Sequence, residues 1–484
     1  MRKFVSLRSL LLLLPFLLCL FARAEADTTS TTTSPMDERE LDALYATIRS
    51  LVGKWFNGTE LYPDPCGWTP IQGVSCDLFH GLWYVTTMVV GPIHDNSFQC
   101  APDAEISPRL FRMKHLRSLS FFGCFHSPIS IQGLPWEKLA HTLETIEFRS
   151  NPGLNGQMPP LFSASLRKLR SLVLLENNLT GELPIGFGNL TELEQLVLAG
   201  NRFTGRIPTT LGGGLTKLLI IDFSRNSLSG PLPPTIKGLT SLLKLDLSNN
   251  SFDGQLPLEL GQLRNLTLLD LRNNRFVNGL PRTLEEMVSL EQALLSNNPI
   301  GGTLTNLNWQ NLESLIALDL SHTGLVGEIP ASMAGMKKLR FLALNDNHLS
   351  GNVPPNFGDM PCVVNALYLN GNDLAGELQF SDGFYGKLGR HFSVRGNPGL
   401  CYDAWAVAGE NAPAGVKACQ KGSPGIVANA GLRMEVIDED AHQSCDRIGS
   451  CVVSGISGTG GFGFWWAIIM AELVTVFFLV FAAS

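Results

Sequence analysis

The middle of the chain repeats one short pattern of leucines that closes on an asparagine, and the pattern returns every 24 to 26 residues. Its consensus is LxxLxLxxNxLxGxIP, as in Leu193 to Asn201 and in Leu242 to Asn250. A fixed period constrains the fold strongly, because each unit must bury its leucines against the next unit in the same way. Asparagine holds the closing position ten times, with Thr323 in the one remaining place: Asn151, Asn177, Asn201, Asn226, Asn250, Asn274, Asn298, Asn347, Asn372 and Asn397.

This period and consensus are the signature of leucine-rich repeats. In such repeats each LxxLxL segment forms a short strand with its leucines pointing inward, and neighbouring strands pair into one parallel sheet. The asparagine side chain is expected to turn inward and to satisfy backbone groups in the bend after the strand. We therefore predict an α/β repeat solenoid of about eleven repeats over residues 116–400, with the parallel sheet on its concave face.

A second motif, Leu-x-Gly-x-Ile-Pro, follows the first in most repeats. It resembles the plant-type class of leucine-rich repeats, and the resemblance implies a second short strand in each repeat. The motif fails at Leu304-Thr305, with Trp309 close behind, and again at Leu378-Gln379. Plain divergence of the repeat and a local docking site both remain open at the first of these places.

The ten cysteines fit an oxidising compartment. A solenoid exposes its apolar core at both ends, so each end needs a cap, and small caps need covalent staples. We therefore predict an N-terminal cap over residues 36–115 and a C-terminal cap over residues 401–420. Three disulfides are expected to staple these caps: Cys66–Cys76, Cys100–Cys124 and Cys401–Cys419. Cys362 is expected to be a buried thiol. For Cys445 and Cys451 two outcomes stay open: a disulfide between them in the stalk, or loss of the pair if lipid attachment cuts the chain before Cys451.

The segment from Asp37 to Gly53 places its apolar residues at helical spacing on one face. We predict an amphipathic helix whose apolar face covers the open N-terminal end of the repeat core. Trp55 and Trp68 lie close to it in the sequence and are expected to pack beside it.

Both ends of the chain carry apolar segments. Residues 1–24 have the layout of a secretory signal peptide, and the Thr/Ser-rich residues 25–35 are expected to form a flexible leader. At the other end, a stalk over residues 421–461 leads into a hydrophobic membrane signal over residues 462–484. This layout favours a GPI anchor, while a transmembrane anchor without a cytoplasmic domain is the alternative. Glu472 weakens both membrane interpretations, because a carboxylate is costly in hydrocarbon.

The sequence offers little support for catalysis. The net charge is −7, so the sequence shows no basic character of the kind that nucleic-acid binding requires. The nine histidines lack metal-ligand spacing, and the GxGxxG at Gly458 to Gly463 follows no βαβ pattern. We expect no cofactor, no bound metal and no enzymatic activity. One position of the repeat carries a recurring aspartate, at Asp222, Asp246, Asp270 and Asp319. Two interpretations of these aspartates stay open: a metal or catalytic site, and ordinary repeat consensus.

Residues between the inward leucines face the concave side, where exposed apolar and aromatic groups favour protein contact. Val173, Leu175 and Val197 are expected to form one exposed apolar patch, and Phe341 and Tyr368 a second. Scattered surface residues without a partner are the alternative. The complete candidate set is Val173, Leu175, Val197, Asp246, Asp270, Arg272, Asp319, Phe341, Asn345 and Tyr368.

Five Asn-x-Ser/Thr sequons predict glycosylation of a secreted protein. They stand at Asn57, Asn178, Asn189, Asn249 and Asn265. A glycan on Asn249 would shield part of the inner surface, because this residue is the last concave-side position before Asn250.

The segments Leu61 to Cys76 and His115 to Phe122 resemble the plant Piriformospora indica-insensitive proteins. These are leucine-rich-repeat proteins similar to the receptor-like protein Too Many Mouths. The resemblance implies a plasma-membrane protein without a kinase domain, which takes part in the response to a beneficial root endophyte.

We therefore expect a glycoprotein on the extracellular face of the plasma membrane that binds a protein or peptide ligand on its concave sheet. Without a cytoplasmic domain it would act as a co-receptor in plant signalling, through a receptor-kinase partner. The second hypothesis is a secreted inhibitor of microbial cell-wall enzymes, similar to polygalacturonase inhibitors, although the C-terminal membrane signal argues against it. Direct tests of pectinase inhibition and of ligand binding separate the two.

Overall fold

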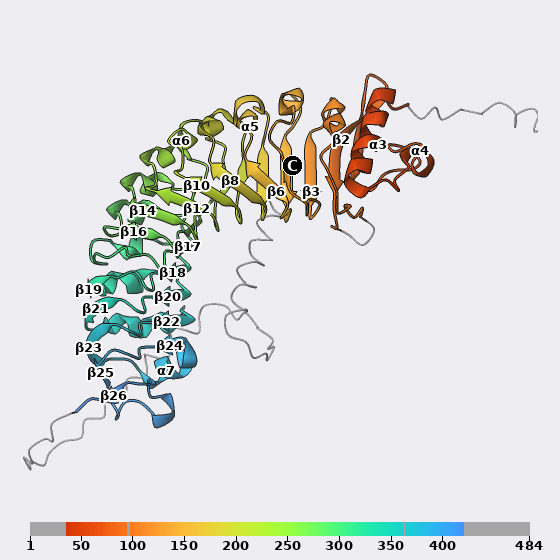
Figure 1. The fold of residues 1–484 in the computed structure, drawn as a ribbon. Coiled ribbons are helices and arrows are strands. Elements are labelled where there is room, and N and C mark those ends of the chain that lie inside the picture. The colour runs from red at the N-terminus through yellow and green to blue at the C-terminus, as the bar shows by residue number, and fades with distance from the viewer. Residues whose placement is uncertain (1–34, 94–96, 363, 421–484) are drawn as a thin grey trace, which may run out of the picture. The chain divides into compact units, whose positions relative to one another are not determined.

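The computed structural model describes residues 35–93, 97–362 and 364–420. The expected signal peptide, stalk and hydrophobic tail lie outside these residues, as do Cys445, Cys451 and the side chain of Cys362. Within the described part the repeats stack side by side in chain order (Figure 1). No helix among the described residues combines the length and the apolarity that a membrane span requires.

The main sheet takes one strand from each repeat, and its order along the sheet follows the chain. In the described residues its 14 strands are β1 (Val74–Phe79), β2 (Leu82–Val90), β3 (Ser118–Phe122), β5 (Thr145–Arg149), β7 (Ser171–Leu175), β9 (Gln195–Val197), β11 (Ile220–Asp222), β13 (Lys244–Asp246), β15 (Leu268–Asp270), β17 (Gln292–Leu294), β18 (Ala317–Asp319), β20 (Phe341–Ala343), β22 (Ala366–Tyr368) and β24 (Phe392–Ser393). Only β1 and β2 pair antiparallel among them, while β2 pairs parallel with β3. The predicted parallel sheet is confirmed, and it extends into the N-terminal cap.

The second strand that the plant-type motif implies is also present, in two shorter sheets. Their described strands are β4 (Ile129–Ser130), β6 (Leu154–Gln157), β8 (Asn178–Glu182), β10 (Arg202–Gly205), β12 (Ser227–Gly230), β14 (Ser251–Gln255) and β16 (Arg275–Val277), then β19 (Val326–Glu328), β21 (His348–Gly351), β23 (Asp373–Leu378), β25 (Gly399–Tyr402) and β26 (Lys417–Ala418). Together we call these two sheets the outer lane. Figure 1 shows the outer lane on the opposite side of the repeats from the main sheet.

The outer lane is interrupted at the repeat in which the second motif fails. Among the described residues, β16 and β19 belong to different sheets, and Leu304-Thr305 lies between them. Trp309 is fully buried, and its Nε1 donates a hydrogen bond to the Leu304 carbonyl at 2.9 Å. The divergence at this repeat therefore serves core packing, since a fully buried indole cannot dock a partner.

Short helical turns connect the strands. The described α-helices are α3 (Glu38–Val52), α4 (Gly58–Leu61), α5 (Pro160–Ser165), α6 (Leu211–Gly214) and α7 (Asp382–Leu388). The 3₁₀ turns are η1 (Pro108–Arg112), η2 (Trp136–Leu139), η3 (Ile185–Asn189), η4 (Pro234–Gly238), η5 (Leu258–Gln262), η6 (Arg282–Glu286), η7 (Trp309–Asn311), η8 (Ala331–Gly335), η9 (Pro355–Cys362), η10 (Gly389–His391) and η11 (Gly409–Asn411). The proline of the second motif precedes these turns, as Pro233 precedes η4 with φ −72°, because its ring fixes the angle that starts the turn.

Asn250 illustrates how the closing asparagines hold the repeats together. Its Nδ2 donates to the carbonyls of Phe223 at 2.9 Å and Leu247 at 3.1 Å, while its Oδ1 accepts from the Leu228 amide at 3.0 Å. The predicted inward turn of this side chain is confirmed. Thr323 keeps only part of the pattern, because its single hydroxyl donates to the Leu320 carbonyl at 2.7 Å.

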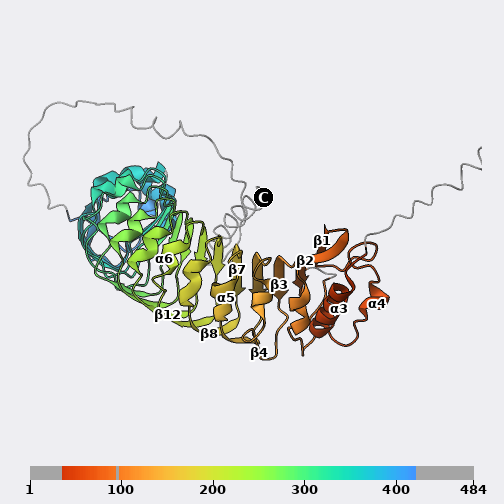
Figure 2. The same ribbon diagram turned by 90° about the horizontal axis from the view of Figure 1, so that it is seen from above.

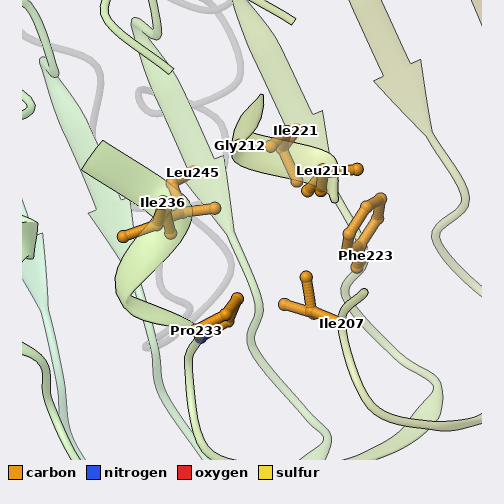
Figure 3. A pocket seen from close by; sticks show the side chains of 8 residues that line it. All are labelled: Ile207, Leu211, Gly212, Ile221, Phe223, Pro233, Ile236 and Leu245. Atoms are coloured by element: carbon orange, nitrogen blue, oxygen red, sulfur yellow. The ribbon is translucent and has the colours of Figure 1, made fainter. Parts of the chain in front are cut away.

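The inward leucines and isoleucines form one continuous core along the solenoid. Each such side chain contributes roughly 1.5–3 kcal/mol by leaving water. Figure 3 shows the side chains that surround one small cavity in this core, whose volume is about 10 Å³. Its lining is entirely apolar apart from backbone: Ile207, Leu211, Gly212, Ile221, Phe223, Pro233, Ile236 and Leu245. A cavity of this size and lining offers no place for a ligand.

Helix α3 covers the N-terminal end of the core, beside β2 (Figure 2). Asp37 caps it by accepting from the amides of Arg39 and Glu40, each at 3.1 Å. Trp55 lies beside the end of α3 as predicted, because its Nε1 donates to the Val52 carbonyl at 2.7 Å, although 62% of the residue is exposed. The predicted packing of Trp68 is wrong, since it is 75% exposed. Phe56, by contrast, is almost fully buried.

Within the described residues three disulfides join Cys66 to Cys76, Cys100 to Cys124 and Cys401 to Cys419. The first ties the loop after α4 to β1, and the second ties the cap to the turn after β3. The third joins β25 to the residue after β26. The prediction of disulfide-stapled caps is thereby confirmed.

Candidate protein-binding surface on the main sheet

The strand register aligns one row of side chains between the inward leucines, which we call the central lane. From β7 to β22 it consists of Val173, Val197, Asp222, Asp246, Asp270, Leu294, Asp319, Ala343 and Tyr368. Figure 1 shows that the main sheet lies on the inner side of the arc that the repeats form. Six of the ten candidate residues belong to this lane, and the other four flank it.

The early part of the surface is apolar. Val173, Val197 and Ala199 form a hydrophobic cluster separate from the main core, and Leu175 and Ile220 pack against it. The expectation of an exposed patch needs correction, because Val173 is only 2% exposed and Val197 only 9%. Side chains on adjacent strands stand close enough to cover one another. Leu175, which is half-buried, offers more of its surface than either valine.

The middle of the surface is charged, and Lys244 lies at its centre. Its Nζ is 3.0 Å from Asp222 Oδ2 and 3.6 Å from Asp246 Oδ2. All three side chains are largely withdrawn from solvent. The ammonium therefore bridges the carboxylates of two adjacent strands, β11 and β13.

Asp246 carries a strongly perturbed pKa. Burial raises this pKa to about 6, and repulsion from Asp222 and Asp270 acts in the same direction, while Lys244 opposes them. For Lys244 itself burial favours the neutral amine, but attraction to Asp222 and Asp246 prevails and raises its pKa. The lane thus holds carboxylates packed closely enough that one of them takes up a proton in mildly acidic solution.

Most of the aspartates in the central lane also accept hydrogen bonds from the nearby backbone. Oδ1 of Asp246 accepts from the amide of Ser248 at 3.1 Å and from its hydroxyl at 2.8 Å. Asp319 makes the same pair of bonds to Ser321, at 3.1 and 2.7 Å. This repeated structural role explains the Leu-Asp-Leu-Ser consensus. No group of three or more His, Cys, Asp or Glu side chains in the described ranges is arranged to hold a metal ion.

Asp270 and Arg272 form a two-pronged ion pair on the same strand end. Arg272 Nε donates to Asp270 Oδ1 at 3.0 Å, and its Nη2 donates to Oδ2 at 2.6 Å. The Asp270 side chain is only 5% exposed, so its carboxylate is covered. A partner would therefore meet the Arg272 guanidinium rather than Asp270.

The late part of the surface is aromatic. The rings of Phe341 and Tyr368 pack edge to face, with centroids 5.9 Å apart, and both are half-buried. Burial raises the pKa of Tyr368, so the phenol stays protonated. Asn345 follows β20 in the same repeat as Phe341, and its Nδ2 donates to Asp346 Oδ2 at 2.6 Å.

The asparagines of the five glycosylation sequons differ in how exposed they are. Asn57, Asn189, Asn249 and Asn265 are exposed, whereas Asn178 is half-buried. Asn249 adopts a left-handed backbone with φ 56°, and its Oδ1 accepts from Asn273 at 2.9 Å. Their glycosylation stays a prediction.

Sequence reasoning missed Lys244, the central cation of the charged part. Lys244 lies two residues before the central lane, in Lys244-Leu245-Asp246, and Phe341 is the one candidate residue from that row. The same repeat alignment could have found it, because its counterpart in the aromatic part is Phe341.

The repeats match the sequence profile of the family described as Leucine Rich Repeat, at residues 168–190, 192–213, 217–239, 241–263, 265–287 and 338–360. Over 173 residues the chain is 52% identical to Piriformospora indica-insensitive protein 2 of Arabidopsis thaliana, covering 36% of this chain and 41% of that protein. The resemblance seen in the sequence is thereby confirmed. Receptor like protein 29 of Arabidopsis thaliana is 34% identical over 173 residues, which is 34% of each chain.

Among solved structures, the plant peptide hormone receptor RGFR1 in complex with RGF2 is 28% identical, with a TM-score of 0.54. The match covers 61% of this chain and 48% of that receptor. The matched regions therefore span less than half the length of each of these three proteins.

Proposed function

We propose that this leucine-rich-repeat protein, which is similar to plant receptor-like proteins, recognises a protein or peptide ligand with the central lane and its flanking rows. The observation that carries the proposal is the ordered change along one sheet face. The surface is apolar at β7 and β9, charged from β11 to β18, and aromatic at β20 and β22. An extended partner with a basic middle and apolar ends is complementary to this order.

The wider role follows from the relatives. RGFR1 is a plant peptide hormone receptor bound to RGF2 in its structure, and the present chain shares its fold. We infer that the chain is displayed at the outer face of the plasma membrane and acts as a co-receptor beside a receptor kinase. A part in the response to a root endophyte is the finer form of this proposal, and similarity to Piriformospora indica-insensitive protein 2 supports it.

Affinity capture of the tagged protein from root membranes, followed by measurement of direct binding, tests this function. We expect recovery of a receptor kinase, with at least tenfold weaker binding after the double substitution Phe341→Ala and Tyr368→Ala, because buried aromatic anchors dominate interface energies. Ile185→Ala is the control, since this exposed residue lies in η3 and outside the main sheet. Equal binding of wild type and the double variant would remove the aromatic pair from the interface. Failure to recover any membrane partner, together with inhibition of a microbial pectinase, would favour the inhibitor function instead.

A further inference from the structure

A pocket of about 640 Å³ lies at the end of the main sheet, where the last repeats meet the C-terminal cap. The strands β22 and β24 form one side of it, and α7, η10 and η11 form the other. Figure 1 shows α7 directly beside β24. A pocket of this volume accommodates a small organic molecule or a few residues of a peptide. We call it the end pocket.

Aromatic side chains line one part of the end pocket. Tyr368 reaches it from β22, Tyr385 from α7 and Phe392 from β24. The rings of Tyr385 and Phe392 have centroids 5.7 Å apart and are tilted by 59°. An aromatic wall of this kind favours a ligand with a planar or apolar group over a ligand that is polar throughout.

The Tyr385 side chain forms part of the wall of the end pocket. The residue is only 3% exposed, and its buried hydroxyl oxygen has no hydrogen-bond partner among the described residues. Because this oxygen is closed off from solvent, Tyr385 offers its ring to a bound molecule and not its hydroxyl.

The charges at the end pocket favour an anion. Arg390 and Arg395 line it, and neither guanidinium forms an ion pair with another described residue. Glu410 is the one acidic side chain in the described lining. Two guanidiniums facing a single carboxylate leave a net positive charge, and planar guanidiniums match the geometry of a carboxylate.

We propose that the end pocket binds an aromatic carboxylate. Its ring packs against Tyr368, Tyr385 and Phe392, and its carboxylate faces Arg390 and Arg395. Two sources share this chemistry, namely a free aromatic acid and the carboxyl end of a peptide with an aromatic last residue. Tyr368 belongs to both this site and the proposed protein-binding surface, so the proposal deepens that function while requiring no protein partner.

Calorimetric titration of the purified full chain with matched probes tests the proposal. One pair is 4-hydroxyphenylacetate and its uncharged amide, and the other is a short acetylated peptide ending in tyrosine and the same peptide with an amidated end. At least one acid should bind about tenfold more tightly than its amide, as a charge-assisted hydrogen bond implies. Tighter binding of the peptide acid would identify a peptide end as the source, and tighter binding of the small acid would identify a free acid. Equal binding of acids and amides, or no saturable binding of any probe, would overturn the proposal.

Three variants assign the residues. Arg390→Gln and Arg395→Gln each remove one guanidinium from the lining, and each should weaken the better acid about tenfold. Lys387→Gln is the control, because it removes a cation from the exposed side of α7 outside the pocket lining. Unchanged acid binding in both pocket variants would refute the site. Intact probe binding by the wild-type chain, when affinity capture recovers no protein partner, would instead count only against the protein-binding surface.

Discussion

The ammonium nitrogen of Lys244 lies 3.0 Å from a carboxylate oxygen of Asp222 on the neighbouring strand, and 3.6 Å from one of Asp246 on its own strand. A single cation therefore compensates two carboxylates that the parallel register brings side by side. The charged part of the surface depends on this cation for its stability as well as for its character, because unpaired buried carboxylates are costly.

Replacement of Lys244 by methionine should destabilise the fold. The substitution keeps most of the side-chain length but removes the charge that Asp222 and Asp246 share. We expect a loss of about 2 kcal/mol at about pH 7.5 and a smaller loss at about pH 5, where Asp246 takes up a proton. Urea unfolding of the two proteins at both pH values measures this, and an equal loss at both would contradict the role of Asp246.

Asp246→Asn should flatten the dependence of stability on pH. Because the folded-state pKa of Asp246 is raised to about 6, the folded protein binds this proton more tightly than the unfolded chain does. Its stabilising contribution is full below the unfolded pKa of roughly 4 and is lost as pH rises through about 6. Wild type should thus lose about 2 kcal/mol more than Asp246→Asn over this window. The exposed Asp253→Asn should retain the wild-type profile.

Two tyrosine-to-phenylalanine substitutions should act in opposite directions. Tyr45 donates its hydroxyl hydrogen to the Tyr62 carbonyl, so Tyr45→Phe should cost about 1 kcal/mol. The Tyr385 hydroxyl has no partner in the described part of the chain, so Tyr385→Phe without ligand should be neutral or stabilising by about 1 kcal/mol. Thermal unfolding of both variants measures these two changes in stability. A clear destabilisation by Tyr385→Phe would mean that the hydroxyl is already satisfied.

Asn250→Ala should strongly destabilise the fold, although it changes only one residue. The side chain bonds to the backbone of its own repeat and of the preceding repeat, and its loss leaves those groups without partners. We expect a loss of about 2–3 kcal/mol. Asn265→Ala serves as the control, because its one bond, to the Thr240 carbonyl, is exposed. Denaturant midpoints that shift equally for both would contradict the structural role of Asn250.

The periodic part of the fold could be predicted because every repeat solves the same packing problem. Leu245 and Asn250 have the same places in their repeat as their counterparts in the others, so one local solution serves all of them. The caps lack this redundancy. Nothing in the sequence near α3 distinguishes Phe56, which packs, from Trp55, which is exposed, because both fit an aromatic position next to a helix end.

The sequence predicts which residues lie on the binding surface, but it does not predict how exposed each side chain is. Periodicity assigns Val173 and Val197 to the correct face, whereas their burial depends on the side chains of neighbouring strands. The end pocket escaped prediction for another reason. Tyr385 lies in α7, which belongs to no repeat, and only the folded chain brings it beside Phe392.

The outer lane is cut once, between β16 and β19, while the main sheet is hydrogen-bonded without a gap from β15 through β17 to β18. The two sides of the described repeats therefore differ in regularity at one place. On the outer side the strand ladder is replaced there by single backbone hydrogen bonds, from the Gly279 amide to the Ile300 carbonyl at 2.8 Å and from the Val326 amide to the Gly302 carbonyl at 2.9 Å. The row of residues that faces a ligand thus keeps one unbroken register past Leu294, because the irregularity of this repeat is confined to its back.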